Sequence, residues 1–241
     1  LVCSIALSVA LLAGVERIRT QTETSFTRAV AGTDLVVGAR SGPVNLMLYS
    51  VFRIGEATNN IRWSSYQAIA KHPRIAWTVP LSLGDSHRGF RVLGTTGAYF
   101  EHYRTGTDRP LAFREGKPFA DVFEAVLGSE VAARLGYRLG QDITLAHGTG
   151  DVSFAEHDDK PFRVVGILAP TGTAVDRTVH VPLEGIEAIH LDWQGGAQIP
   201  GLAITPEQAR RMDLAPKAIT AFLVGVKSKA AVFQLQRQIN E

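Results

Sequence analysis

Residues 162–183 read FRVVGILAPTGTAVDRTVHVPL and decide the fold of this chain. The first half is almost wholly apolar up to Pro170, as a buried strand requires. In the second half, valines alternate with Thr178 and His180, which is the two-residue period of a β-strand. Glycine and threonine at 171–173 favour a change of direction. We therefore expect two strands joined by a turn, with Thr178 and His180 on one face of the second strand.

The polar side chains of this stretch could also indicate a reactive loop, because an acid, a base and two hydroxyls lie close together. Asp176 and Arg177 are more simply explained by an Asx-type turn or a turn ion pair. His180 lies on a strand, where we expect it to face solvent or a neighbouring strand. The sequence therefore predicts a structural corner and no active site here.

The rest of the chain mixes short strands with short helices, which indicates the α+β class. We expect a turn at 84–86 between two strands, and Ser129 as the N-cap of a short helix. Further strands are expected at 35–37, 76–83, 89–95, 122–127, 142–146 and 217–229, and further helices at 63–71, 99–103, 130–135, 183–193 and 230–241.

The first fifteen residues, LVCSIALSVALLAGV, carry no charge, and Glu16, Arg17 and Arg19 follow directly. They fall short of the roughly 20 residues that span a bilayer, yet they lack the polar stripe of a core helix. We interpret 1–15 as the end of a transmembrane helix that continues outward and stops at Gly32. The alternative is a buried core helix. Since the last residues also read as the middle of a helix, the chain is interpreted as a fragment.

Residues 41–60 are too apolar for an ordinary surface loop. They could pack over the domain, or they could form a contact surface for membrane, partner or cargo. The sequence leaves both interpretations open. The candidate contact residues are Leu46, Leu48, Tyr49, Phe52 and Ile54.

The sequence indicates neither nucleic-acid binding, nor an intrachain disulfide, nor a metal site. The formal net charge is only +2 and no Lys/Arg run exceeds two residues, which argues against nucleic-acid binding. Cys3 is the single cysteine, so no intrachain disulfide can form. The run His157-Asp158-Asp159 is better explained as a solvated turn than as a metal site.

Enzymatic motifs are also missing. The chain has no GxxxxGK[ST] and no GxGxxG after a strand, so no nucleotide cradle is expected. The sequence around Ser129, LGSEV at 127–131, lacks the second glycine of a nucleophile elbow. We therefore predict no catalytic residue, no cofactor and no metal, and a protein that is not an enzyme.

Five segments in order along the chain resemble one family. They are GVERIR (14–19), GTDLVVGARSG (32–42), EAVLGSEVAARLGYRLGQDITL (124–145), FRVVGILAPTGTAVDRTVHVPLEGIEAI (162–189) and ITAFLVGVKS (219–228). Together they resemble the MacB-like periplasmic core domain of ABC transporter permeases, which is also seen in FtsX-like and lipoprotein-release permeases. The likeness covers roughly the whole chain.

The resemblance implies a two-lobed periplasmic domain at the inner (cytoplasmic) membrane. A porter-like α/β lobe would comprise 16–96 and 161–241, a small β-rich lobe would be inserted at 97–160, and 1–15 would end transmembrane helix 1. Residues 41–60 and 148–160 depart from the family pattern; the latter resemble a variable insertion.

The implied function is mechanotransmission, in which a cytoplasmic ABC ATPase drives export or extraction of a peptide, lipid or lipoprotein through this domain. The ATPase would be a separate chain or domain, and the implied partners include a second permease copy, a periplasmic partner and the membrane. One alternative is a scaffold or regulatory domain that controls an envelope hydrolase. Another is an exported hydrolase, which would need a nucleophile and base that the sequence does not bring together.

Overall fold

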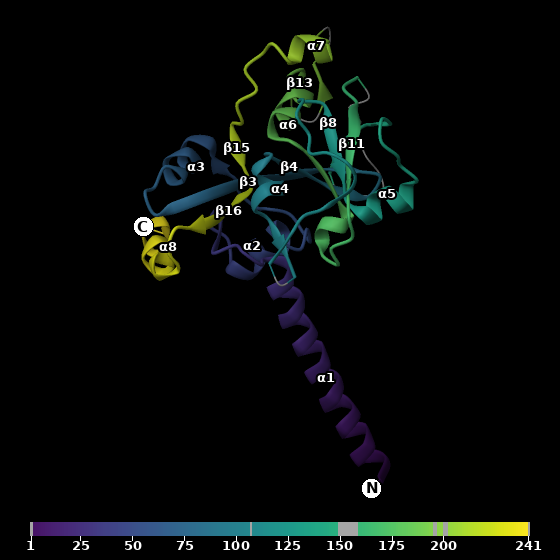
Figure 1. Ribbon diagram of the computed structural model, residues 1–241, viewed down its shortest axis with the longest axis vertical. Helices are drawn as coiled ribbons and strands as arrows, with labels where there is room; N and C mark the ends of the chain where they lie inside the picture. Colours follow the sequence, from purple (N-terminus) through teal and green to yellow (C-terminus); the bar gives the residue numbers. More distant parts are fainter. Residues whose placement is uncertain (1, 107, 149–158, 195–196, 200–201, 241) are drawn as a thin grey trace.

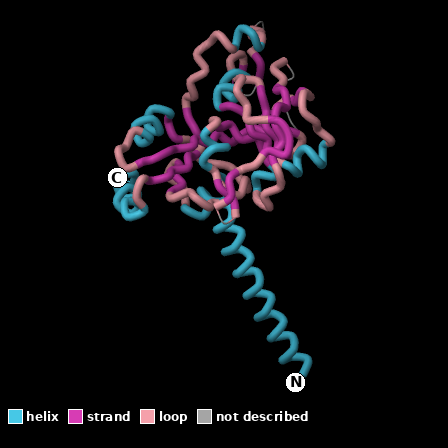
Figure 2. The backbone as a smooth tube through the Cα atoms, viewed as in Figure 1, coloured by secondary structure: helices cyan, strands magenta, loops and turns pink. Residues whose placement is uncertain are grey.

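The computed structural model describes residues 2–106, 108–148, 159–194, 197–199 and 202–240. A long helix projects from a body in which strands run through the middle and most helices lie at the periphery (Figures 1 and 2). The helices are α1 (Val2–Ala29), α2 (Pro43–Ser50), α3 (Trp63–Ala70), α4 (Ala98–His102), α5 (Ser129–Leu135), α6 (Leu183–Ile189), α7 (Pro206–Ala209) and α8 (Val232–Asn240), with 3-10 turns η1 (Ala174–Arg177) and η2 (Lys229–Ala231). The α+β class is confirmed.

A ten-stranded mixed sheet organises the body, in the order β1-β16-β3-β4-β12-β8-β11-β7, with β10 on β3 and β9 on β11. Its strands are β1 (Leu35–Gly38), β3 (Ile75–His87), β4 (Phe90–Thr95), β7 (Phe113–Gly116), β8 (Glu124–Leu127), β9 (Asp142–Ile143), β10 (Ala146–His147), β11 (Phe162–Leu168), β12 (Thr178–Pro182) and β16 (Ala221–Val226). Two-stranded pairs join β2 (Ile61–Arg62) to β15 (Ala218–Ile219), β5 (Arg104–Thr105) to β6 (Arg109–Pro110), and β13 (Trp193–Gln194) to β14 (Ala197–Gln198).

The two strands of the 162–183 stretch form as expected, but they are not neighbours in the sheet. Strand β8 lies between them, parallel to β11 and antiparallel to β12. The connection between β11 and β12 therefore crosses the end of β8. All five residues of β12 are buried, so of the two alternatives for His180, a solvent-facing side chain was wrong.

Two local predictions were also wrong. Strand β3 runs through 84–86, where its register against β4 shifts as in a β-bulge. The turn lies at Arg88-Gly89, where both φ angles are positive (46° and 80°), the pattern of a tight hairpin turn. The N-cap of helix α5 is Gly128, and Ser129 is the first residue of the helix and not its cap.

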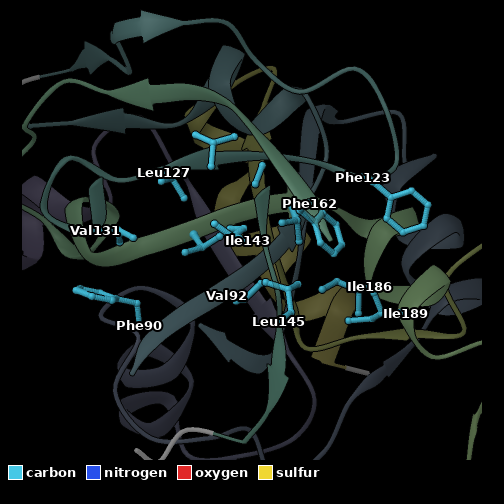
Figure 3. Packing of buried hydrophobic residues seen from close by; sticks show 14 of the residues in the cluster. Phe90, Val92, Phe123, Leu127, Val131, Ile143, Leu145, Phe162, Ile186 and Ile189 are labelled. Atoms are coloured by element: carbon cyan, nitrogen blue, oxygen red, sulfur yellow. The ribbon is translucent and has the colours of Figure 1, made fainter. Parts of the chain in front are cut away.

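The core lies on both faces of the sheet. The largest cluster packs β4, β8, β11 and β12 against α5 and α6, as Figure 3 shows for Phe162, Ile143 and Ile186. A second cluster joins β3 to α4, and a third joins β16 to α3 and α8. The lobe boundaries at 97 and 160 stay a prediction; the sheet itself crosses them, because β8 pairs with both β11 and β12.

Helix α1 leaves its apolar N-terminal half uncovered. Its large apolar side chains between Ile5 and Val15 are 57% to 73% exposed, so the alternative of a buried core helix is wrong. Gly32, with φ 74°, follows the end of the helix by three residues, close to the expected stop. Among the described residues, no helix combines the length and the hydropathy of a membrane span. That residues 1–15 end a transmembrane helix stays a prediction.

Candidate functional site

The apolar segment 41–60 folds as helix α2 followed by a loop. Pro43 occupies the first turn of α2, where its missing N–H costs no hydrogen bond. The helix lies against β1 at Gly38. A Cβ built on Gly38 would stand 2.3 Å from a methyl of Leu46 and 2.7 Å from the hydroxyl of Tyr49. The close approach of α2 to the sheet therefore depends on that glycine.

The five candidate contact residues are divided between the core and the surface. Tyr49 is only 2% exposed, and Leu46 and Phe52 are half-buried. Leu48 and Ile54 are 37% and 59% exposed. The segment thus covers the domain with one side and presents apolar side chains to the outside with the other. A contact role for the exposed residues stays a prediction.

We expect the double substitution Leu48→Ser and Ile54→Ser to change the free energy of unfolding by less than about 1 kcal/mol, because exposed side chains contribute little to stability. The matched control is Val51→Ala, which trims a 4% exposed residue of the same segment and should cost about 2 kcal/mol. Urea unfolding of the three proteins measures both values. A loss above 2 kcal/mol in the double variant would assign these residues to the core.

The polar residues between β11 and β12 form a structural corner, as predicted. The Asp176 carboxylate accepts hydrogen bonds from the Thr171 backbone N–H (2.8 Å), the Thr171 hydroxyl (2.9 Å) and the Gly172 N–H (2.7 Å). The Thr173 hydroxyl accepts from the N–H of Val175 and caps η1. Of the two alternatives for Asp176-Arg177, the turn ion pair is not found among the described residues, where the Arg177 Nε lies 3.5 Å from Glu130. These side chains hold the connection in shape.

His180 is completely buried in the centre of the sheet. Its Nδ1 lies 3.2 Å from the Val126 carbonyl oxygen on the neighbouring strand, and its ring packs against Tyr99 and Phe100. Burial, with a smaller contribution from the charge of Arg53, lowers the pKa of His180 to about 3. The imidazole is therefore neutral at physiological pH. Of the two expected environments, the neighbouring strand is correct and solvent is not.

A line of aromatic side chains connects helix α1 to His180. The Tyr103 hydroxyl donates a 2.5 Å buried hydrogen bond to the carbonyl oxygen of Ala29, the last residue of α1. Tyr103 stacks on Tyr99 with ring centroids 4.8 Å apart, and Tyr99 contacts His180. Sequence analysis missed this link, although the helical spacing of residues 99 and 103 was visible.

A buried ion pair was also missed. Lys160 and Asp192 both have fully buried side chains, and the Lys160 Nζ lies 2.8 and 2.9 Å from the two Asp192 carboxylate oxygens. Although burial by itself raises the pKa of the Asp192 carboxyl, hydrogen bonds from Lys160 and from the N–H of Ile204 hold it below its ordinary value. A lysine directly before a strongly apolar strand was the only sequence signal.

No metal centre is indicated within the part of the chain that the structure describes, where no three His, Cys, Asp or Glu side chains are placed to hold an ion. His157 and Asp158 lie outside the described residues. Asp159 is described, and its carboxylate pairs with Lys160. Ser129 starts α5 and is 8% exposed.

Comparison with known proteins identifies a family. The model of the MacB-like periplasmic core domain matches residues 1–241. No curated protein is similar enough in sequence to count as a relative.

Two solved structures resemble the chain. One is the periplasmic region of MacB from Actinobacillus actinomycetemcomitans (13% identity, 89% of this chain and 87% of that chain, TM-score 0.48). The other is the extracellular domain of the noncanonic ABC-type transporter YknZ from Gram-positive bacteria (11% identity, 85% and 91%, TM-score 0.47). Both TM-scores are below 0.5, so the assignment rests on the family model.

Proposed function

Because this chain belongs to the MacB-like periplasmic core domain family, we propose that it is the extracytoplasmic part of an ABC transporter permease that couples cytoplasmic ATP hydrolysis to movement of a hydrophobic or amphipathic cargo. The cargo class comprises peptides, lipids and lipoproteins. The ATPase is a separate chain or domain, and two permease copies work together at the inner membrane. The domain transmits force and carries out no chemical step itself.

Helix α1 is the observation that supports this proposal. Its 28 residues form one continuous helix, roughly 42 Å long at 1.5 Å per residue. The N-terminal half exposes apolar side chains, and the C-terminal end of the helix reaches the body (Figure 1). Such a helix can act as a rigid rod that carries a displacement from apolar surroundings to the domain.

The attachment of α1 to the body suits the same role. The carbonyl oxygen of Ala29 would otherwise be an unpaired helix-end group, and the buried Tyr103 hydroxyl satisfies it. Tyr103 and Tyr99 are 4% and 0% exposed, so a movement of α1 meets the packed core directly. A packed core is nearly incompressible, so it moves with the helix as a unit.

The test is to break the helix in the full permease with its ATPase. Thr22→Pro places a proline in the interior of α1, where it removes a hydrogen bond and kinks the helix at a cost of about 3 kcal/mol; Thr22→Ala is the matched control. Within this chain, Cys3→Ser and Arg134→Cys leave one exposed cysteine for labelling, and any cysteine elsewhere in the permease is replaced as well. The readout is the ATP-dependent change in the distance between spin labels on the two copies.

We expect Thr22→Ala to retain the ATP-dependent change in distance. Thr22→Pro should lose most of it while ATP hydrolysis continues, because the motor then runs without a rigid connection. If the proline variant moves like the control, or if the control shows no ATP-dependent movement, the domain is no mechanical transmitter.

A further inference from the structure

An arginine-rich pocket of about 210 Å³ lies beside the loop that follows α2. Three elements meet there: the loop, strand β4 and the 3-10 turn η1. The main side chains that line it are Phe52, Arg53, Ile54, Phe90, Arg91 and Arg177. Three arginines thus line one pocket, and its described lining contains no acidic residue.

Among the described residues, Arg91 has few hydrogen-bond acceptors. Its side chain is only 18% exposed, and its Nη2 donates to the Gly55 carbonyl oxygen at 2.9 Å. The Glu56 carboxylate is 3.8 Å from Nη1, beyond hydrogen-bonding distance, and is itself 62% exposed. Glu56 lines a separate pocket that Arg91 also lines. Burial lowers the pKa of Arg91, and the charge of Glu56 offsets this only in part.

Arg53 is placed differently. Its Nη1 donates to the Ser50 carbonyl oxygen, its Nε is buried without a hydrogen-bond partner among the described residues, and its charge acts on the buried side chains of Tyr99, Tyr103 and His180. A buried guanidinium N–H without an acceptor is costly. Arg177 is 61% exposed, and its Nε lies 3.5 Å from Glu130. Within the part of the chain that the structure describes, Arg91 therefore keeps donors for a ligand, and the exposed Arg177 adds a second cation.

The remaining wall of the pocket is apolar. Phe52 is half-buried, Ile54 is 59% exposed, and Phe90 continues into the main core, as Figure 3 shows. The volume is below the 300–1,000 Å³ that is usual for pockets that enclose a whole ligand. The pocket suits one charged end of a larger molecule, whose apolar part would continue along Ile54.

We propose that this pocket binds the phosphate or carboxylate end of an anionic amphiphile. Guanidinium groups hold such anions through paired, charge-assisted hydrogen bonds, and the anion supplies acceptors to Arg91 and Arg177. Phe52 and Ile54 cover the first methylene groups of the chain. The binding site is argued from the pocket alone. The further step, that the bound amphiphile is cargo of the transporter, rests on the proposed function.

Binding of hexyl phosphate and of inorganic phosphate to the 241-residue chain in a neutral maltoside detergent provides the test, by calorimetric titration. We expect hexyl phosphate to bind more tightly than inorganic phosphate. Arg91→Gln should weaken the binding of hexyl phosphate roughly tenfold or more, since it removes hydrogen bonds to a charged group. Arg163→Gln is the control, because Arg163 is 65% exposed and does not line the pocket.

Arg177→Gln is a second variant, at an exposed position where folding is not at risk, and it should weaken binding several-fold. The proposal is overturned if hexyl phosphate binds no better than inorganic phosphate. It is equally overturned if Arg91→Gln and Arg177→Gln, both folded, bind hexyl phosphate like Arg163→Gln. If Arg91→Gln does not fold, the binding of hexyl phosphate by Arg177→Gln alone tests the proposal.

Sedimentation with vesicles distinguishes the two sources of the anion. If the pocket takes membrane headgroups, Arg91→Gln lowers binding to phosphatidylglycerol vesicles and leaves binding to phosphatidylcholine vesicles unchanged. If it takes a free amphiphile, the variant loses hexyl phosphate and sediments like the wild type; both results support the pocket. The two proposals can fail separately. If the wild-type protein binds hexyl phosphate but shows no ATP-dependent movement, the pocket proposal holds and only the proposed function is contradicted.

Discussion

Replacing Lys160 with methionine is expected to destabilise the domain by about 3–5 kcal/mol, because the substitution leaves the fully buried Asp192 carboxylate without its cation. Chemical unfolding at pH 7 measures the loss. Lys117→Met is the control, since Lys117 is exposed and its loss should stay within about 0.5 kcal/mol. The double variant Lys160→Met with Asp192→Asn should recover much of the stability, because no buried charge then remains.

The pH dependence gives a second readout of the same pair. The pKa of Asp192 is lowered in the folded protein. The contribution of Asp192 to stability is therefore complete above its pKa in the unfolded chain, about 4, and is lost as the pH falls through its pKa in the folded protein. In Lys160→Met, burial without the cation raises that pKa instead. The gap between variant and wild type should therefore narrow from pH 7 to pH 5. A gap of equal size at both pH values would mean that the variant does not contain a buried Asp192 carboxylate that lacks the Lys160 cation.

Gly128→Ala is expected to cost about 3 kcal/mol, at the upper end of what overpacking costs. A Cβ at this position would stand 2.2 Å from the carbonyl oxygen of Val175 and 2.5 Å from that of Asp176. The backbone of Gly128, with φ −64° and ψ 153°, is allowed for any residue, so the cost is purely steric. It arises because the connection from β11 to β12 passes directly over the end of β8.

Gly97→Ala is the matched control for this steric argument. Gly97 has helical angles and no atom within 4 Å of a Cβ, so alanine there should be neutral or stabilising by up to about 1 kcal/mol. Thermal unfolding of both variants decides the matter. If Gly128→Ala melts with the wild type, the crossing does not lie against β8 as the structure places it.

Local elements were largely predictable, because short-range patterns specify them. The strand at β11, the helix at α3 and the corner at 171–176 each follow from residues within a few positions of one another. At the corner, Asp176 reaches N–H groups only four and five residues away, so the sequence contains the whole hydrogen-bonded unit. The prediction of a turn at 84–86 was wrong because Gly84 lies within a long strand that forms a bulge there. Turns and β-bulges favour the same residues, so the sequence does not distinguish them.

The candidate site was only half visible from the sequence. The apolar character of 41–60 showed that the segment is special, but composition does not say which side chains point inward. The burial of Tyr49 and the exposure of Ile54 depend on how α2 lies on β1 at Gly38. The cluster of Arg53, Arg91 and Arg177 joins three separate parts of the chain, and no local pattern relates them.

By itself, the sequence determined many of the secondary elements, the corner between β11 and β12 and the order of segments that marks the family, since each depends on neighbouring residues or on their succession. Only the tertiary structure decided that β8 lies between β11 and β12, that His180 is buried and that Lys160 meets Asp192 32 residues later. The physical reason is that an alternating pattern specifies a strand but not its neighbours. Strand order and the pairing of buried charges are chosen by the packing of the whole chain.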